Sequence, residues 1–241
     1  MQLLVSVRSA AEAGIALAGG ADIVDAKEPS RGSLGAVSPT ELLQICQCVP
    51  ADQPVSIALG DVATATEVLQ AIAIVPRSLR RATYLKLGFA GITDPDVVHR
   101  LLRVALDSVA GQSISIVAVA YADAVNAGSL QPEILRDIAE DAGVVGMLLD
   151  TYQKGDYHLL TWLDRSRLAA LLARARAARF LTAVAGGLGV AHLSDLRALE
   201  PDIVGFRGAV CVGGREGPLS GRRLRFIRRQ LRVPDSGFVR H

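Results

Sequence analysis

Short apolar runs alternate with longer amphipathic segments along the whole of this 241-residue chain. The short runs consist mainly of valine, isoleucine, leucine and alanine, which is typical of parallel strands buried on both faces. The pattern predicts eight strands, which are Leu3–Val7, Asp22–Asp25, Val55–Leu59, Thr83–Leu87, Ser115–Val119, Gly146–Leu149, Leu181–Val184 and Asp202–Gly205.

A helical pattern follows each predicted strand. After Arg165, for example, Leu168, Leu171 and Leu172 share one face of a helix, and we expect that face to be buried. The predicted helices are Ala10–Ala18, Pro39–Cys48, Ala65–Ile74, Asp94–Val109, Pro132–Asp141, Arg165–Ala178, Ala191–Leu199 and Leu219–Gln230.

Eight strand–helix pairs without a break in composition favour one closed (β/α)8 barrel over an open sheet. We therefore expect an α/β protein with a single TIM barrel. The barrel is predicted to span residues 1–231, and a short basic C-terminal tail is predicted for residues 232–241. In such barrels the active site lies at the carboxyl ends of the strands.

Composition excludes several classes of function. Aromatic residues make up 4% of the chain and the net charge is +2, which argues against a nucleic-acid partner. No apolar run reaches the roughly 18 residues of a membrane span, and the N-terminus lacks a signal-peptide pattern, so we expect a cytoplasmic protein without a membrane partner. Cys46, Cys48 and Cys211 are too few and too badly spaced for a disulfide framework, and we expect no metal site.

Lysine is rare in this chain. Only Lys27, Lys86 and Lys154 occur, against 23 arginines, and each lies at or just past the end of an apolar run. A primary amine can lose its proton and form a Schiff base with a carbonyl, whereas a guanidinium stays charged. The lysines therefore predict amine chemistry; chance survival of three basic positions is the competing interpretation.

The residues that could take part in catalysis or binding collect at the carboxyl ends of the predicted strands. All three lysines and four acids fall there, so the barrel topology would bring them to one rim. The candidate residues of this rim are Asp25, Lys27, Asp61, Lys86, Tyr121, Asp123, Asp150, Lys154, Gly186, Gly187, Arg207 and Gly208.

Lys86 has a predictable direction. It is flanked by Leu85 and Leu87, so strand alternation points it away from both. An unpaired lysine under the helices would be costly, so we expect Lys86 to face the lumen, where neighbouring cations would lower its pKa. A simple salt bridge with Asp61 or Asp25 is the structural alternative.

Two glycine-bearing loops, residues 184–189 and 205–214, follow the last two predicted strands. These loops commonly bind phosphate in this fold, because backbone N–H groups approach an anion closely where no Cβ intervenes. We expect Gly186, Gly187 and Gly208 to contribute N–H groups and Arg207 to add a fork of donors, although such glycines also mark ordinary turns. The long polar loop at residues 25–36 could close over a ligand through Ser33, or be a surface excursion.

The sequence resembles the (5-formylfuran-3-yl)methyl phosphate synthase family of methanofuran biosynthesis. The likeness runs from residue 3 to about residue 214 and preserves the order of the motifs. The matching stretches are LLVSV, GGADIVDAKEPSRGSLGA, SIALGDV, YLKLGFAGI, VAVAYADA, DAGVVGMLLDT and PDIVGFRGAVCVGG.

This resemblance implies a lyase that condenses two molecules of glyceraldehyde 3-phosphate to 4-(hydroxymethyl)-2-furancarboxaldehyde phosphate. By position, Lys27 matches the Schiff-base lysine of the family and Lys86 its proton-transferring lysine, while Asp150 and Lys154 match further site residues. It implies no metal or organic cofactor, and triose phosphates as the small-molecule partners. Barrels of this kind often associate, so we expect a homo-oligomer.

Two other functions remain open on the sequence. A class I aldolase would use the same lysine chemistry but release an open-chain sugar phosphate. A phosphometabolite-binding barrel without turnover would bind the same ligands and form no covalent adduct.

Overall fold

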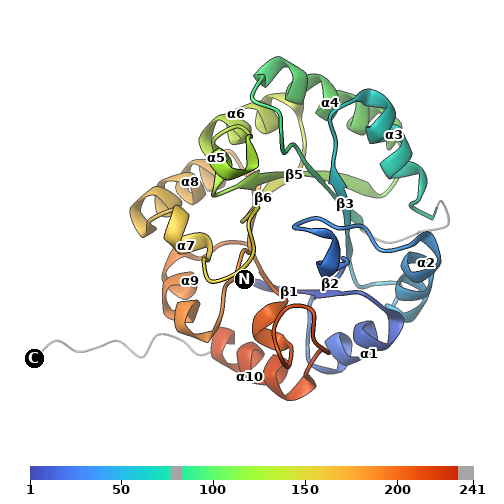
Figure 1. Ribbon diagram of the computed structural model, residues 1–241, viewed down its shortest axis with the longest axis vertical. Helices are drawn as coiled ribbons and strands as arrows, with labels where there is room; N and C mark the ends of the chain where they lie inside the picture. The colour runs from blue at the N-terminus through green and yellow to red at the C-terminus, as the bar shows by residue number, and fades with distance from the viewer. Residues whose placement is uncertain (77–82, 233–241) are drawn as a thin grey trace, which may run out of the picture.

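Eight parallel strands close into a barrel in chain order, and helices surround it (Figure 1). The computed structural model describes residues 1–76 and 83–232. The predicted (β/α)8 TIM barrel is therefore confirmed. The strands are β1 (Gln2–Val7), β2 (Ile23–Ala26), β3 (Val55–Asp61), β4 (Thr83–Gly88), β5 (Ile114–Tyr121), β6 (Gly146–Asp150), β7 (Leu181–Val184) and β8 (Ile203–Phe206).

The helices begin where the sequence offers a cap. Ser38 and Glu41 form a reciprocal capping box at α2, and the Asp94 side chain accepts from the first N–H groups of α4. The helices are α1 (Ala10–Ala18), α2 (Pro39–Cys48), α3 (Ala65–Ala73), α4 (Pro95–Ser108), α5 (Ala124–Ala127), α6 (Pro132–Ala142), α7 (Leu159–Trp162), α8 (Arg165–Ala177), α9 (Leu193–Leu199) and α10 (Gly221–Arg232), with 3-10 turns η1 (Pro29–Arg31), η2 (Val190–His192) and η3 (Gly208–Val210).

All eight predicted helices are present within a few residues of their expected bounds, and the short helices α5 and α7 are additions. The predicted helix from Ala191 is split, because η2 precedes α9. Three rim residues expected just after their strands instead end them. Asp61 closes β3, Tyr121 closes β5 and Asp150 closes β6, since the pairing of β5 with β6 continues to the last residue of both.

Alternation along the strands separates two apolar layers. Val55, Ile57 and Leu59 of β3 belong to the large cluster beneath the helices, whereas Ala58 belongs to a smaller cluster inside the barrel. The inner cluster also contains Leu4, Ile23, Val117, Leu148, Ala183 and Ile203. Apolar side chains therefore fill the barrel interior below the rim, and a polar layer takes their place near the carboxyl ends.

The loop between β2 and α2 turns inward over the barrel mouth (Figure 1). Leu34 of this loop is 1% exposed and joins the inner cluster with Tyr121 and Ala127. The loop is therefore packed into the mouth, which leaves the open part of the rim on the side of β1, β6, β7 and β8.

The predicted tail, residues 232–241, lies almost entirely outside the described residues. Arg232 is the last residue of α10, and residues 233–241 lie outside the described part of the chain. No helix among the described residues combines the length and the apolar character needed to span a membrane.

Candidate active site

A cavity of about 510 Å³ opens at the carboxyl ends of the strands. All three lysines line it, together with Asp25, Asp150 and the two glycine-bearing loops. Each of these strands turns alternate side chains inward, so residues distant in sequence meet in one polar layer. The lining residues predicted from the sequence are Asp25, Lys27, Lys86, Asp150, Lys154, Gly186, Gly187, Arg207 and Gly208.

Lys86 lies at the floor of the cavity against Asp25. Leu85 and Leu87 point under the helices, as predicted, and the Lys86 Nζ lies 2.6 Å from the Asp25 Oδ1. The Ser6 hydroxyl donates to the other carboxylate oxygen of Asp25 at 2.8 Å. Both carboxylate oxygens of Asp25 are thus held, and the ion pair is almost fully buried.

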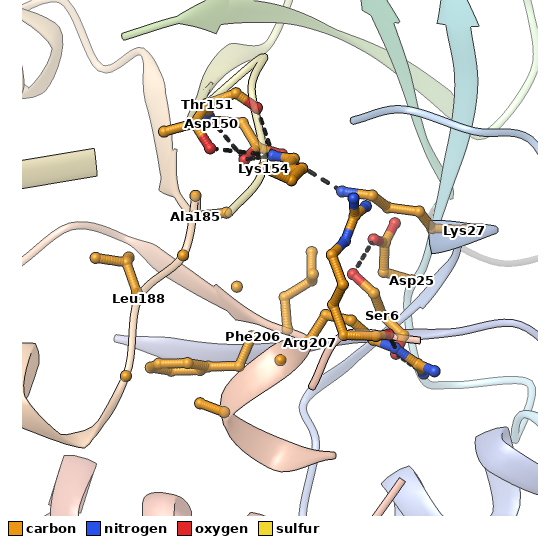
Figure 2. Close-up of a pocket in the computed structure, with 18 of the residues that line it drawn as sticks. Ser6, Asp25, Lys27, Asp150, Thr151, Lys154, Ala185, Leu188, Phe206 and Arg207 are labelled. Carbon is orange, nitrogen blue, oxygen red and sulfur yellow. Dashed lines mark hydrogen bonds and ion pairs between the residues drawn. The ribbon is translucent and has the colours of Figure 1, made fainter. Parts of the chain in front are cut away.

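Asp150 joins the other two lysines. Lys154 Nζ donates to Asp150 Oδ1 at 2.7 Å, and Lys27 Nζ lies 3.4 Å from Asp150 Oδ2 (Figure 2). The backbone N–H of Thr151 donates to Oδ1 at 2.8 Å and fixes the carboxylate. One buried carboxylate therefore links an amine from the β2 loop with an amine from the β6 loop.

Burial and charge act in opposite directions on these groups. Burial lowers the pKa of Lys86 below its usual value, although Asp25 opposes the shift. Burial likewise lowers the pKa of Lys154 to about 8, against the pull of Asp150. Burial alone would raise the pKa of Asp25 and Asp150, but the neighbouring lysines outweigh it, so both pKa values fall below the usual range. The site thus combines ionised carboxylates with amines that lose a proton readily.

The loop after β7 requires glycine at two positions. Gly186 has a φ of 88° and Gly187 a φ of 64°, in the left-handed region. A Cβ at Gly186 would lie 2.9 Å from the backbone nitrogen of Thr151. The loop therefore packs directly against the segment that carries Asp150, and both glycines line the cavity.

Four predicted residues do not line the cavity. The Ser33 hydroxyl donates to the carbonyl oxygens of Thr151, at 2.5 Å, and Tyr152, at 2.9 Å, which ties the β2 loop to the β6 loop. Of the other three, Asp61 and Tyr121 lie near Leu34, and all three are held by contacts outside the cavity. The Tyr121 hydroxyl donates to Asp61 at 2.8 Å, and Asp123 accepts from the backbone N–H groups of residues 152 and 153 at 2.6 and 2.9 Å. These contacts position loops and keep the four side chains away from the lysines.

Arg207 lines the cavity, but its donors are already engaged. Its guanidinium forms a buried ion pair with Glu12 and also donates to the carbonyl oxygens of Ser6, Arg215 and Gly217. A guanidinium has five N–H groups, and these contacts use all of them. The expected fork toward a phosphate is therefore directed into the protein instead.

Sequence reasoning missed Ser6, Glu12, Thr151 and Arg215. Alternation along β1 places Ser6 in the lumen, so that signal was readable in the sequence. Glu12 lies in the first turn of α1 and carries no motif that marks it as a partner of Arg207. Across the described residues, no three His, Cys, Asp or Glu side chains are grouped so that they could hold a metal ion.

The family model described as 4-HFC-P synthase matches residues 3–228 of this chain. The chain belongs to the 4-HFC-P synthase family. The matched range includes every lysine and carboxylate of the cavity. The resemblance found in the sequence is thereby confirmed at the level of the family.

Curated relatives agree. A (5-formylfuran-3-yl)methyl phosphate synthase from Methanothermobacter thermautotrophicus is 36% identical over 215 residues, which covers 89% of this chain and 91% of the relative. A putative (5-formylfuran-3-yl)methyl phosphate synthase from Streptomyces griseus is 38% identical over 195 residues, covering 80% of this chain and 78% of the relative. The names of these relatives indicate that this 4-HFC-P synthase family member is an enzyme.

Solved structures share the fold at low sequence identity. Phosphoribosylanthranilate isomerase from Thermotoga maritima superposes with a TM-score of 0.62 at 14% identity, covering 96% of this chain and 98% of the other. A 3-hexulose-6-phosphate synthase superposes with a TM-score of 0.58 at 16% identity, covering 94% and 99%. For this 4-HFC-P synthase family member, these likenesses support the TIM barrel alone.

Proposed function

We propose that this enzyme condenses two molecules of glyceraldehyde 3-phosphate to 4-(hydroxymethyl)-2-furancarboxaldehyde phosphate through a Schiff base on Lys27. One inorganic phosphate and two water molecules leave, so carbon, oxygen and phosphorus balance. The observation that carries the proposal is the convergence of all three lysines on two buried carboxylates in one cavity. The volume of about 510 Å³ is within the usual range for small-molecule sites.

Lys27 is the proposed nucleophile because it is the cavity lysine with the longest contact to its carboxylate. Its Nζ lies 3.4 Å from Asp150, whereas Lys86 and Lys154 are held at 2.6 and 2.7 Å. The neutral amine attacks the carbonyl carbon of a triose phosphate, and loss of water leaves an iminium. The iminium draws electrons from the adjacent carbon and makes its proton acidic.

Lys86 is the proposed base for that carbon. Burial lowers its pKa, and Asp25 holds the amine beneath the cavity in a fixed direction. Removal of the proton gives an enamine, whose carbon forms the new bond to the aldehyde carbon of the second triose phosphate. The electron pair of the enamine makes this bond, and the aldehyde oxygen takes up a proton.

Asp150 and Lys154 are the proposed proton carriers for the eliminations. Asp150 contacts both Lys27 and Lys154, so a proton released at Lys27 can pass through its carboxylate to Lys154. Lys154, whose pKa falls to about 8, can then return protons to leaving hydroxyl groups. Loss of phosphate and of water yields the aromatic furan, which makes the later steps favourable. Addition of water to the iminium carbon breaks its C–N bond, which frees Lys27 and leaves a carbonyl group on the product.

The scarcity of lysine makes the covalent step easy to test. Borohydride adds hydride to the iminium carbon and converts the Schiff base into a stable secondary amine. Peptide mass spectrometry then has only three lysine side chains to distinguish. We expect the triose phosphate adduct on Lys27, together with a furan absorbance in unquenched reactions.

The outcomes separate the open alternatives. An adduct on Lys27 with only an open-chain sugar phosphate as product would favour the class I aldolase. Absence of any adduct, with triose phosphate still bound, would refute the Schiff-base mechanism and favour a binding protein without turnover.

A further inference from the structure

The proposed substrates carry phosphate groups, so the cavity needs a cation that is free to bind them. Arg207 is unsuited to this task, because its N–H groups are all engaged and Glu12 neutralises its charge within the protein. The three lysines are assigned to the covalent and proton-transfer steps. Another side-chain cation must therefore bind the phosphate groups.

Arg215 lies on the same loop as Arg207 and lines the cavity. Its Nη2 donates to the carbonyl oxygen of Gly32 at 2.9 Å, which leaves most of its N–H groups without an acceptor in the described part of the chain. Among the described residues it also has no carboxylate within 4.0 Å. A half-buried guanidinium without a counter-ion is well suited to bind an anion.

The electrostatics place Arg215 next to the reacting groups. Its charge contributes to lowering the pKa of Lys154, and the Asp150 carboxylate in turn acts on the Arg215 guanidinium. Burial lowers the pKa of Arg215 itself, because few partners replace the lost water. An anion bound at Arg215 would therefore lie in the cavity that Lys154 also lines.

The contact from Arg207 explains how the loop presents this side chain. Arg207 Nε donates to the Arg215 carbonyl oxygen at 2.7 Å, and Nη2 donates to the Gly217 carbonyl oxygen at 3.0 Å. A buried ion pair with Glu12 anchors the guanidinium that makes both contacts. Arg207 thus fastens the backbone on either side of residue 216 while the Arg215 side chain extends into the cavity.

We infer that Arg215 binds the phosphate monoester of a triose phosphate, and that the Glu12–Arg207 pair is a positioning device for it. The inference rests on the proposed function and deepens it by naming the phosphate-binding side chain. Gly186 and Gly187 line the same cavity, so that backbone N–H groups of this loop would complete the anion site. Arg215 keeps its charge while the proposed steps deprotonate the lysines, so it supplies a permanent cation for the anionic ligand.

The test measures phosphate binding directly, without turnover. Isothermal titration of the full chain with inorganic phosphate should show binding by the wild type, and Arg215→Met should weaken it by about 10- to 100-fold. Arg215→Lys should recover part of the loss, since it restores charge without the fork. Arg225→Met, on the outer face of α10, removes the same charge from an exposed position and should leave the dissociation constant unchanged.

A second readout separates phosphate recognition from the covalent step. Borohydride trapping of unphosphorylated glyceraldehyde on Lys27 should proceed in Arg215→Met as in the wild type, while trapping of glyceraldehyde 3-phosphate should need a higher concentration by the same 10- to 100-fold. If phosphate binding depends on Arg215 but no furan forms, the proposed function fails and this inference stands. Equal phosphate affinity of Arg215→Met and wild type, or no phosphate binding by the wild type at tens of millimolar, would overturn the inference.

The positioning role of the ion pair has its own signature. Glu12→Gln should weaken phosphate binding while Arg215 is present and have little further effect in the Arg215→Met background. A purely structural Glu12 would give additive effects on the phosphate dissociation constant, which would overturn the positioning part of the inference.

Discussion

Replacing Glu12 by glutamine tests the central ion pair of the barrel mouth. The carboxylate of Glu12 is bound in two places by Arg207, and both side chains are at least nine-tenths buried. Glutamine keeps the shape but removes the charge, and its amide group would face guanidinium N–H donors. The variant therefore leaves a buried cation without its counter-ion.

The size of the effect follows from what remains around Arg207. Breaking a buried pair by removing one partner typically costs about 3 to 5 kcal/mol. Three carbonyl oxygens, from Ser6, Arg215 and Gly217, still accept from the guanidinium, so we expect the lower end, about 3 kcal/mol. In a domain of this size, that loss corresponds to a Tm lower by roughly 6 to 12 °C.

Glu133→Gln provides a matched control on the outside of the barrel. Glu133 also forms a two-point ion pair with Arg167, at 2.5 and 2.7 Å, but these side chains are 32% and 37% exposed. Water can replace such a partner, so we expect a loss below about 1 kcal/mol. Urea unfolding at pH 7 and thermal melts of both variants give the two values. Losses that agree within about 0.5 kcal/mol would refute the reasoning that burial sets the strength of the Glu12 pair.

Three further predictions follow from the cavity. Lys27→Arg should lower kcat by at least about a thousandfold in the furan assay while the melt is unchanged, and activity above a tenth of wild type would contradict the covalent step. The pKa of Lys154 falls from 10.5 to about 8 on folding, so the folded state binds fewer protons than the unfolded state between these pH values. The unfolding free energy of wild type relative to Lys154→Met should therefore rise as pH increases from about 8 to 10.5. A flat or falling difference in urea titrations would contradict the shift. Gly186→Ala should raise the KM and lower the Tm, because its φ is 88° and its Cβ would lie 2.9 Å from the Thr151 nitrogen, whereas Gly60→Ala, with a φ of 92° and no atom within 4 Å of the Cβ, should show backbone strain alone and an unchanged KM.

The fold could be predicted from the sequence because each strand–helix unit has its own local sequence pattern. Apolar runs and capping residues place strands and helices independently, and the topology then follows from their number and order. The direction of Lys86 was also predictable, since alternation with Leu85 and Leu87 is a property of the strand itself. The meeting of Lys27 and Lys154 was predictable from the strand order, because the carboxyl ends of the barrel strands share one rim.

Which rim side chains are free to bind a ligand, and which are held by other parts of the protein, could not be predicted from the sequence. Which of Arg207 and Arg215 keeps free donors toward the cavity depends on a buried carboxylate 195 residues away from Arg207, and no local pattern contains that contact. Asp61 and Tyr121 lie at the correct ends of their strands, but Leu34 from the β2 loop packs over that sector. Side-chain direction within loops is fixed by such distant contacts, so strand ends alone overpredict the site.

Confinement of every lysine to one recess also sets the reactivity of the whole molecule toward acylating and aldehyde reagents. Lys27 and Lys86 are 7% and 3% exposed, and the Lys154 side chain is 17% exposed. A bulky activated ester should therefore label lysine slowly, and any label that does attach should fall in the recess and cost turnover. A reagent small enough to enter the recess becomes an inactivator.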